Sequence, residues 1–175
     1  PTETAEDAAR RHTKDKARVN PDKAYFEQLY TFSELDRDPR GRVVAVAYLA
    51  LIPWEFLSDE ERLDTKDAWW QKADRLPALA FDHAHIATTA RTRLVSRISY
   101  TTLIGKLLPT SFTLTELEKA YEVVLDKKID KRNFRKKIFS IDVLKELSRM
   151  RSGGRHRPAK LYRFKSGKVK EITVL

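Results

Sequence analysis

The sequence predicts an α+β fold in two parts, in which a sandwich of helices and strands is followed by a compact set of helices and a hairpin. Apolar residues make up 41% of the 175 residues, enough to form a buried core. Two segments rich in aromatic and β-branched residues lie in the first half, and three short helical patterns precede two more strand-like segments in the second. Charge is divided in the same way, with −3 over residues 1–80 and +11 over residues 101–175.

Composition excludes several classes of protein. The absence of cysteine excludes a disulfide framework, a thiolate metal site and a cysteine nucleophile. No apolar run approaches the ~18 residues of a membrane span, and residues 1–20 lack the apolar centre of a signal peptide. We therefore expect a soluble, cytoplasmic protein, and its net charge of +10 suggests a polyanionic partner.

The first half begins with a predicted surface helix over residues 2–19, capped by Thr2 or Thr4 and followed by Pro21. Residues 24–33 and 42–52 then predict a hairpin.

The turn of that hairpin contains Pro39 and Gly41, which suit a tight reversal. Because its second strand is nearly all apolar, we expect both faces of that strand to be covered. The run "DAWW" predicts a further short strand with Trp69 and Trp70 half-buried. Base or ligand stacking is the alternative for this pair.

A helix is predicted from Asp82, as its N-cap, to Ile98, and it connects the two halves. His83 and His85 lie two residues apart on this helix, so their side chains diverge and favour capping or packing over a shared metal.

The second half has the element order of a winged helix-turn-helix. Helices are predicted over residues 101–108, 112–125 and 131–140, and strands over 142–150 and 160–164, the latter pair around a basic loop with Gly153 and Gly154. In the second helix Thr115 and Glu118 have the spacing of a capping box. In the third, Asp130 is the predicted cap, and Phe134 and Ile138 point inward.

The third helix of such a domain enters the DNA major groove, where Arg and Lys read guanine and Asn reads adenine. Arg132, Asn133 and Lys136 lie opposite its apolar face. The wing, which is the predicted hairpin of residues 142–164 with its basic loop, suits phosphates or the minor groove. A merely solvated basic helix is the alternative. The candidate DNA-binding residues are Thr113, Thr115, Lys131, Arg132, Asn133, Arg135, Lys136, Arg155, His156, Arg157 and Lys160.

Arginines also cluster around the predicted hairpin turn of the first half. Arg40 and Arg42, with Arg37 nearby, are candidates for contact with an anionic effector, and exposed turn charge is the alternative.

Segments along the whole chain, in order, resemble the NrtR family, the Nudix-related transcriptional regulators. They are "EQLYTF", "DRDPRGRVVAVAYLAL", "WW", "LPALAFDHA", "FTLTELEKAYEVVL", "DKRNFRKKI" and "RPAKLYRF". The resemblance implies a Nudix-like effector and dimerisation domain over residues 1–97, an α/β/α sandwich that is partial here. A winged helix-turn-helix would span 98–166 and a tail 167–175.

The resemblance further implies a homodimeric repressor of NAD biosynthesis or salvage genes that binds a palindromic operator. ADP-ribose is the usual inducer in that branch, and sugars act in others. No cofactor is expected. A Nudix fold has strands and a glycine-rich turn before its signature, and residue 1 falls inside the signature, so we expect this chain to be a piece of a longer one.

Alignment of Glu3 and Arg11 with the Nudix box places His12, Asp15 and Lys16 where three metal-binding glutamates belong, and Arg18 at the glycine. Histidine and lysine cannot supply the hard oxygens that Mg²⁺ prefers. The resemblance therefore implies loss of hydrolysis with ligand binding retained. Two rival hypotheses are an active Nudix hydrolase that cleaves ADP-ribose, and an RNA-associated basic protein.

Overall fold

The computed structural model describes residues 2–151 and 158–172. The chain divides into two compact units, residues 1–93 (the N-terminal unit) and residues 94–175 (the C-terminal unit). The mixed α+β fold predicted from the sequence is confirmed. No helix within the described residues is both long and apolar enough to cross a membrane.

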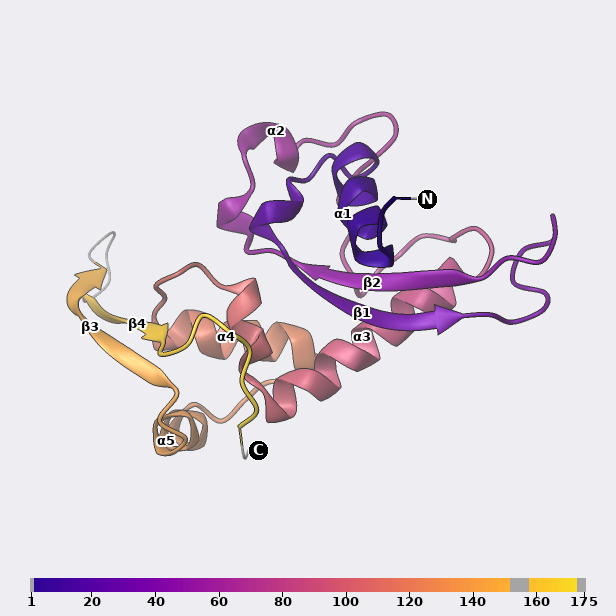
Figure 1. Ribbon diagram of the computed structural model, residues 1–175. Helices are drawn as coiled ribbons and strands as arrows, with labels where there is room; N and C mark the ends of the chain where they lie inside the picture. The colour runs from indigo at the N-terminus through magenta and orange to yellow at the C-terminus, as the bar shows by residue number, and fades with distance from the viewer. Residues whose placement is uncertain (1, 152–157, 173–175) are drawn as a thin grey trace. The chain divides into compact units, whose positions relative to one another are not determined.

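The N-terminal unit is built on an antiparallel hairpin of β1 (Tyr25–Phe32) and β2 (Ala45–Leu51) (Figure 1). Gly41 has a φ of +152°, which suits glycine, and its N–H donates to the Asp38 carbonyl in the connecting loop. Helix α1 (Ala5–Asp15) lies against this hairpin, with the Arg10 guanidinium 4.4 Å from the centre of the Phe26 ring. Its N-cap is Thr4, which forms a capping box with Asp7.

Two expectations for this unit are wrong. Only Leu51 of β2 is buried, and Val46 is 42% exposed, so the described residues cover the faces of this strand only in part. The run at 67–70 forms no strand, since no described strand pairs with it. Trp69 and Trp70 are exposed instead, and Trp70 packs edge-on against Trp54 at 5.4 Å.

Short helical segments connect the rest of the N-terminal unit. They are η1 (Pro21–Lys23), η2 (Trp54–Phe56) and α2 (Asp59–Arg62). Ser58 caps α2 and forms a capping box with Glu61, so this acidic segment contains one helical turn.

Helix α3 (His83–Tyr100) begins in the N-terminal unit and ends in the C-terminal unit. It starts directly after Asp82 as predicted, but the Asp82 carboxylate binds Arg37 through two hydrogen bonds of 2.9 and 3.0 Å. His85 packs edge-on against Phe32, and His83 against Phe81. The packing role predicted for these histidines is confirmed.

The C-terminal unit has the predicted order of three helical segments and a hairpin. The elements are η3 (Thr102–Leu107), α4 (Leu114–Leu125), α5 (Lys131–Ser140), β3 (Leu144–Arg151) and β4 (Ala159–Phe164). Ile98, Leu103, Leu117 and Tyr121 form the centre of its core, each at most 2% exposed.

Gly105 of η3 sits where a side chain would strike Phe164. A Cβ there would lie 2.7 Å from a carbon of the Phe164 ring, which is itself held 5.4 Å from the Phe112 ring. We expect Gly105→Ala to destabilise the C-terminal unit by about 1–3 kcal/mol, because the packed ring has little room to shift. Thermal unfolding followed by circular dichroism measures the change. Gly167→Ala is the control, since open space surrounds that glycine.

The Glu61 carboxylate joins three segments of the N-terminal unit. It accepts hydrogen bonds from the Lys23 ammonium at 2.8 Å and from the backbone N–H groups of Ser58 and Asn20 at 2.6 and 2.7 Å. These contacts, the Lys23 bond foremost, lower the pKa of Glu61 from 4.5 to about 2.

This lowered pKa predicts a loss of stability in acid. The folded state holds its proton less tightly than the unfolded chain does, so the contribution is complete above about pH 4.5 and is lost as the pH falls towards 2. We expect Glu61→Gln to cost ~1 kcal/mol at pH 7 and to flatten the acid dependence. Tryptophan fluorescence reports this unit, which contains Trp54, Trp69 and Trp70. An equal effect from Glu60→Gln, at the exposed neighbour, would contradict the assignment.

Candidate nucleic-acid interface and effector region

Helix α5 presents a polar, cationic surface from an apolar support. Asp130 caps it, and its carboxylate accepts a hydrogen bond from the Asn133 N–H at 2.7 Å. Phe134 and Ile138 are buried, at 5% and 4% exposure, and the Phe134 ring packs edge-on against Tyr121 of α4 at 5.3 Å. The residues that the sequence assigns to DNA on this helix all lie exposed: Lys131, Arg132, Asn133, Arg135 and Lys136.

The start of α4 differs from the predicted one by two residues. Thr113 is the N-cap, and its hydroxyl and N–H form the capping box with Glu116. Glu118, assigned to the box from the sequence, is instead 3% exposed and lies 3.4 Å from the Lys131 ammonium. Thr115 is exposed in the first turn, whereas Thr113 is buried.

The turn between α4 and α5 is held by Glu122. Asp126 ends α4 in the left-handed conformation, with a φ of +52°. The Glu122 carboxylate accepts hydrogen bonds from the Ile129 N–H and the Lys128 ammonium, each at 3.1 Å, and these contacts lower its pKa. This network fixes where α5 begins.

Strands β3 and β4 form the predicted antiparallel hairpin. Lys160 lies exposed on β4, and its ammonium is 2.6 Å from Glu146, a contact that raises the pKa of Lys160. Arg155, His156 and Arg157 lie outside the described residues.

Sequence reasoning missed Arg151, at the end of β3. Its guanidinium pairs with Glu116 and donates to the Ser111 carbonyl at 3.3 Å, which ties β3 to the start of α4. The same S/T-x-x-E spacing that suggested Thr115 also marks Thr113 and Glu116, so the cap could have been found from the sequence. The Arg151 contact spans 35 residues and leaves no local signal.

The candidate effector arginines already have partners in the hairpin loop. Arg40 binds the Asp38 carboxylate at 2.8 and 2.9 Å and lies 4.8 Å from the centre of the Phe81 ring. The bonds from Arg40 lower the pKa of Asp38 to about 2. Arg42 donates to the carbonyls of Ser33 and Glu34. Their assignment to an effector stays a prediction.

The segment aligned with the Nudix box forms α1 and the turn after it. Glu3 and Arg11 pair through two bonds of 2.7 and 3.0 Å, which lower the pKa of Glu3, and Arg11 also lies 3.9 Å from Asp15. Arg18 has a φ of +57°, the left-handed conformation that favours the glycine of the pattern. In the described part of the chain, His, Asp and Glu form no cluster of three that could hold a metal ion.

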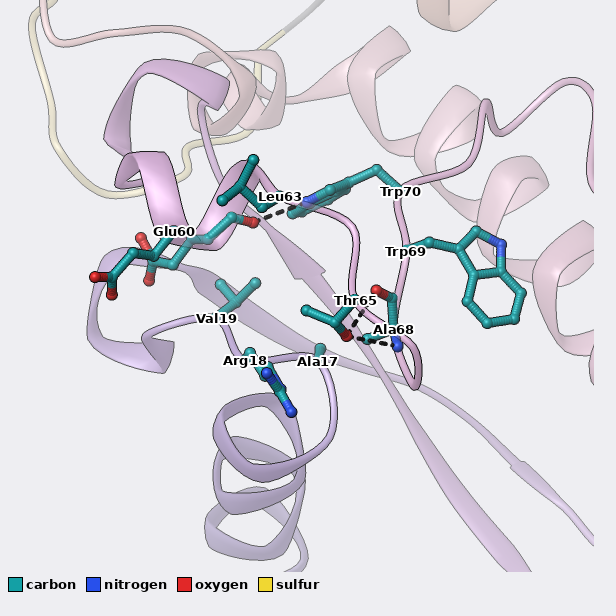
Figure 2. A pocket seen from close by; sticks show the side chains of 10 residues that line it. Ala17, Arg18, Val19, Glu60, Leu63, Thr65, Ala68, Trp69 and Trp70 are labelled. Carbon is teal, nitrogen blue, oxygen red and sulfur yellow. Dashed lines mark hydrogen bonds between the residues drawn. The ribbon is translucent and has the colours of Figure 1, made fainter.

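Figure 2 shows a hollow of about 120 Å³ beside the end of α1, between Val19 and the loop that carries Trp69 and Trp70. The Trp70 indole N–H donates to the Glu61 carbonyl at 2.8 Å and holds that loop in place. Small-molecule sites are typically about 300–1,000 Å³, so this hollow alone could accommodate only part of a nucleotide.

Comparisons with known proteins agree with this arrangement. Residues 104–164 match the model of the NrtR DNA-binding winged helix domain. The chain is 35% identical over 154 residues to a protein of Acinetobacter baylyi named "ADPR responsive transcriptional repressor NtrR", and it spans 61% of that relative's length. It is 35% identical over 85 residues to the ADP-ribose pyrophosphatase of Methanocaldococcus jannaschii, which is 48% of this chain and 47% of that protein.

Two solved structures are similar to this chain over nearly its whole length. Shewanella oneidensis NrtR complexed with a 27mer DNA shares 35% identity at a TM-score of 0.78, over 93% of this chain and 74% of that one. A MutT/nudix family protein of Enterococcus faecalis shares 30% identity at a TM-score of 0.62, over 94% of this chain and 71% of that one. From its match to the winged helix model and its similarity to Shewanella NrtR over nearly the whole chain, we conclude that this chain belongs to the NrtR family.

Proposed function

We propose that this protein is a transcriptional repressor that binds double-stranded DNA through its C-terminal unit. The observation that carries the proposal is α5, a capped helix anchored by Phe134 and Ile138 whose other face is exposed and cationic. A major groove about 12 Å wide admits one such helix. The relative from Shewanella that was crystallised with DNA supports the same role.

Within this proposal, the residues divide by task. Arg132, Asn133 and Lys136 of α5 read base edges. Thr115, exposed in the first turn of α4, lies at the phosphate backbone, as helix N-termini commonly do, and Thr113, the buried N-cap, positions that turn. The cations assigned to phosphates or the minor groove are Lys131, Arg135, Arg155, His156, Arg157 and Lys160.

The N-terminal unit, in the same proposal, binds an ADP-ribose-type nucleotide and mediates a homodimer that reads a palindromic operator of NAD biosynthesis or salvage genes. The ADP-ribose response in the name of the Acinetobacter relative supports the effector. The effector releases DNA by favouring a spacing of the two winged helices that misfits the half-sites. It can shift the equilibrium only by its difference in affinity for the two arrangements.

Hydrolysis is lost in this proposal. Glu3 is paired with Arg11, and of the three positions where the pattern has metal-binding glutamates, only Asp15 is acidic. Hydrolysis of ADP-ribose is the second candidate, favoured by the similarity to the archaeal pyrophosphatase. An assay for AMP release with Mg²⁺ separates the two. Turnover that disappears in Asp15→Ala would establish the hydrolase.

A gel-shift titration tests the repressor directly. We expect the full chain to bind its own upstream DNA more tightly than a random duplex at 100–200 mM salt, with a log–log salt slope of about −0.9 per phosphate neutralised. Added ADP-ribose is expected to release the DNA, whereas pentoses leave it bound. Equal affinity for the upstream DNA and the random duplex would refute the proposal.

A further inference from the structure

A groove of about 500 Å³ opens on the C-terminal unit alongside α5. Its walls come from the end of α3, the end of α4, the turn after α4 and the first half of α5. Ile98, Tyr121, Leu125, Ile129 and Phe134 line it with apolar surface. Small-molecule sites are typically apolar and about 300–1,000 Å³ in volume, with a few polar groups that fix the orientation of the ligand.

Tyr121 places one such polar group in the groove. The residue is 2% exposed, and its ring is fixed edge-on against Phe134. Its hydroxyl makes no hydrogen bond to another described residue, and it is not among the fully buried atoms that lack a partner, so it keeps some contact with solvent. Burial raises the pKa of Tyr121 to about 12, so the phenol keeps its proton and remains a donor at neutral pH. A ligand with an acceptor oxygen would satisfy this group.

The charged groups at the mouth favour an anion. Lys127 and Lys137 both line the groove, both are exposed, and neither pairs with a carboxylate among the described residues. Among the described residues that line the groove, Asp130 is the one acid, and its carboxylate is already engaged at the start of α5 by the Asn133 N–H. Within the described residues, two ammonium groups without a carboxylate partner therefore lie beside the apolar lining of the groove.

We propose that this groove binds a small aromatic carboxylate. The ring of this ligand lies against Tyr121, Leu125 and Phe134. Its carboxylate pairs with the Lys137 ammonium and accepts a hydrogen bond from the Tyr121 hydroxyl. Apolar walls bury the ring, and the lysines supply the charge-assisted contact that a neutral compound would lack.

Occupancy of this groove is expected to change DNA binding, a consequence that rests on the proposed function. Asn133 and Lys137 line the groove and also belong to α5, where Asn133 is a proposed base reader. A carboxylate held at Lys137 lowers the net positive charge of α5 and restricts the side chain of Asn133. The site is separate from the nucleotide effector proposed for the N-terminal unit.

Titration of the full chain with 2-naphthoate, followed by ¹H–¹⁵N NMR, tests the site without DNA. We expect saturable one-to-one binding that shifts the amide signals of Ser99, Ile129 and Asn133. The neutral 2-naphthamide is expected to bind at least about threefold more weakly. Lys137→Gln and Tyr121→Phe should each raise the Kd about threefold to tenfold, since each removes one polar contact. Lys119→Gln, an exposed cation outside the groove, is the matched control.

Three results would overturn the site. These are the absence of saturable binding, equal binding of the acid and the amide, and concentration-dependent signals that show a second copy covering the groove. A chain that binds upstream DNA but not naphthoate would refute the groove alone. A chain that binds naphthoate but shows no preference for upstream DNA would refute the proposed function alone.

Discussion

Phe134→Ala is expected to destabilise the C-terminal unit by about 3–5 kcal/mol, the usual cost of removing a buried phenylalanine ring. Phe134 is 5% exposed, and it joins α5 to Tyr121 of α4. Loss of the ring leaves a cavity beneath the cationic helix and frees that helix from its support. DNA binding is expected to fall with it, because α5 would no longer be held in one orientation.

The two units allow this loss to be located. The chain has three tryptophans, all in the N-terminal unit, so tryptophan fluorescence follows that unit while helical circular dichroism follows both. The dichroism transition should move to lower denaturant much more than the fluorescence transition. Phe139→Ala is the control on the same helix, since Phe139 is 48% exposed. Similar losses in both variants would mean that Phe134 does not anchor α5.

Arg132→Ala and Asn133→Ala are each expected to reduce discrimination between operator and mismatched DNA by about 1–3 kcal/mol, the value of one good base contact. Both side chains are exposed on α5. Arginine suits guanine and asparagine suits adenine, so the two losses should fall at different base pairs. Competition binding with single-base variants of the operator measures each loss.

The control for these two variants is a substitution that removes a positive charge outside the proposed DNA-binding surface. Lys14→Ala removes an exposed cation from α1 in the other unit and should leave discrimination unchanged. Arg157→Ala, a proposed phosphate contact, should weaken all duplexes about equally. Uniform weakening by Arg132→Ala and Asn133→Ala as well would remove both residues from base reading.

Much of the C-terminal unit could be predicted because its signals are local. Asp130 caps α5 three residues before Asn133, and Phe134 and Ile138 keep the helical spacing of a buried face. The start of α4 was harder, because Thr113–Glu116 and Thr115–Glu118 both satisfy the capping pattern. Tertiary packing decides between them, since Glu118 lies on the buried face with Leu117.

The structure of the N-terminal unit was harder to predict, because it depends more on contacts between residues that are distant in the sequence. Arg37 binds Asp82 across 45 residues, so the aspartate expected to cap α3 is committed elsewhere. Arg40 finds its partner only two residues away, yet its charge alone suggested an effector contact. Trp69 and Trp70 are residue types that favour strands, but a segment forms a strand only where a neighbouring strand can pair with it.

Glu116 fastens the cap of α4 and the end of β3 with a single carboxylate. Displacement of β3 would deprive Thr113 of its partner, and unwinding of the first turn of α4 would release Arg151. One carboxylate therefore couples β3 to the start of α4, and we expect these two elements to meet a duplex as one rigid body. The affinity for DNA would then depend on the orientation that β3 and α4 share relative to the duplex. It would not depend on separate movements of either element.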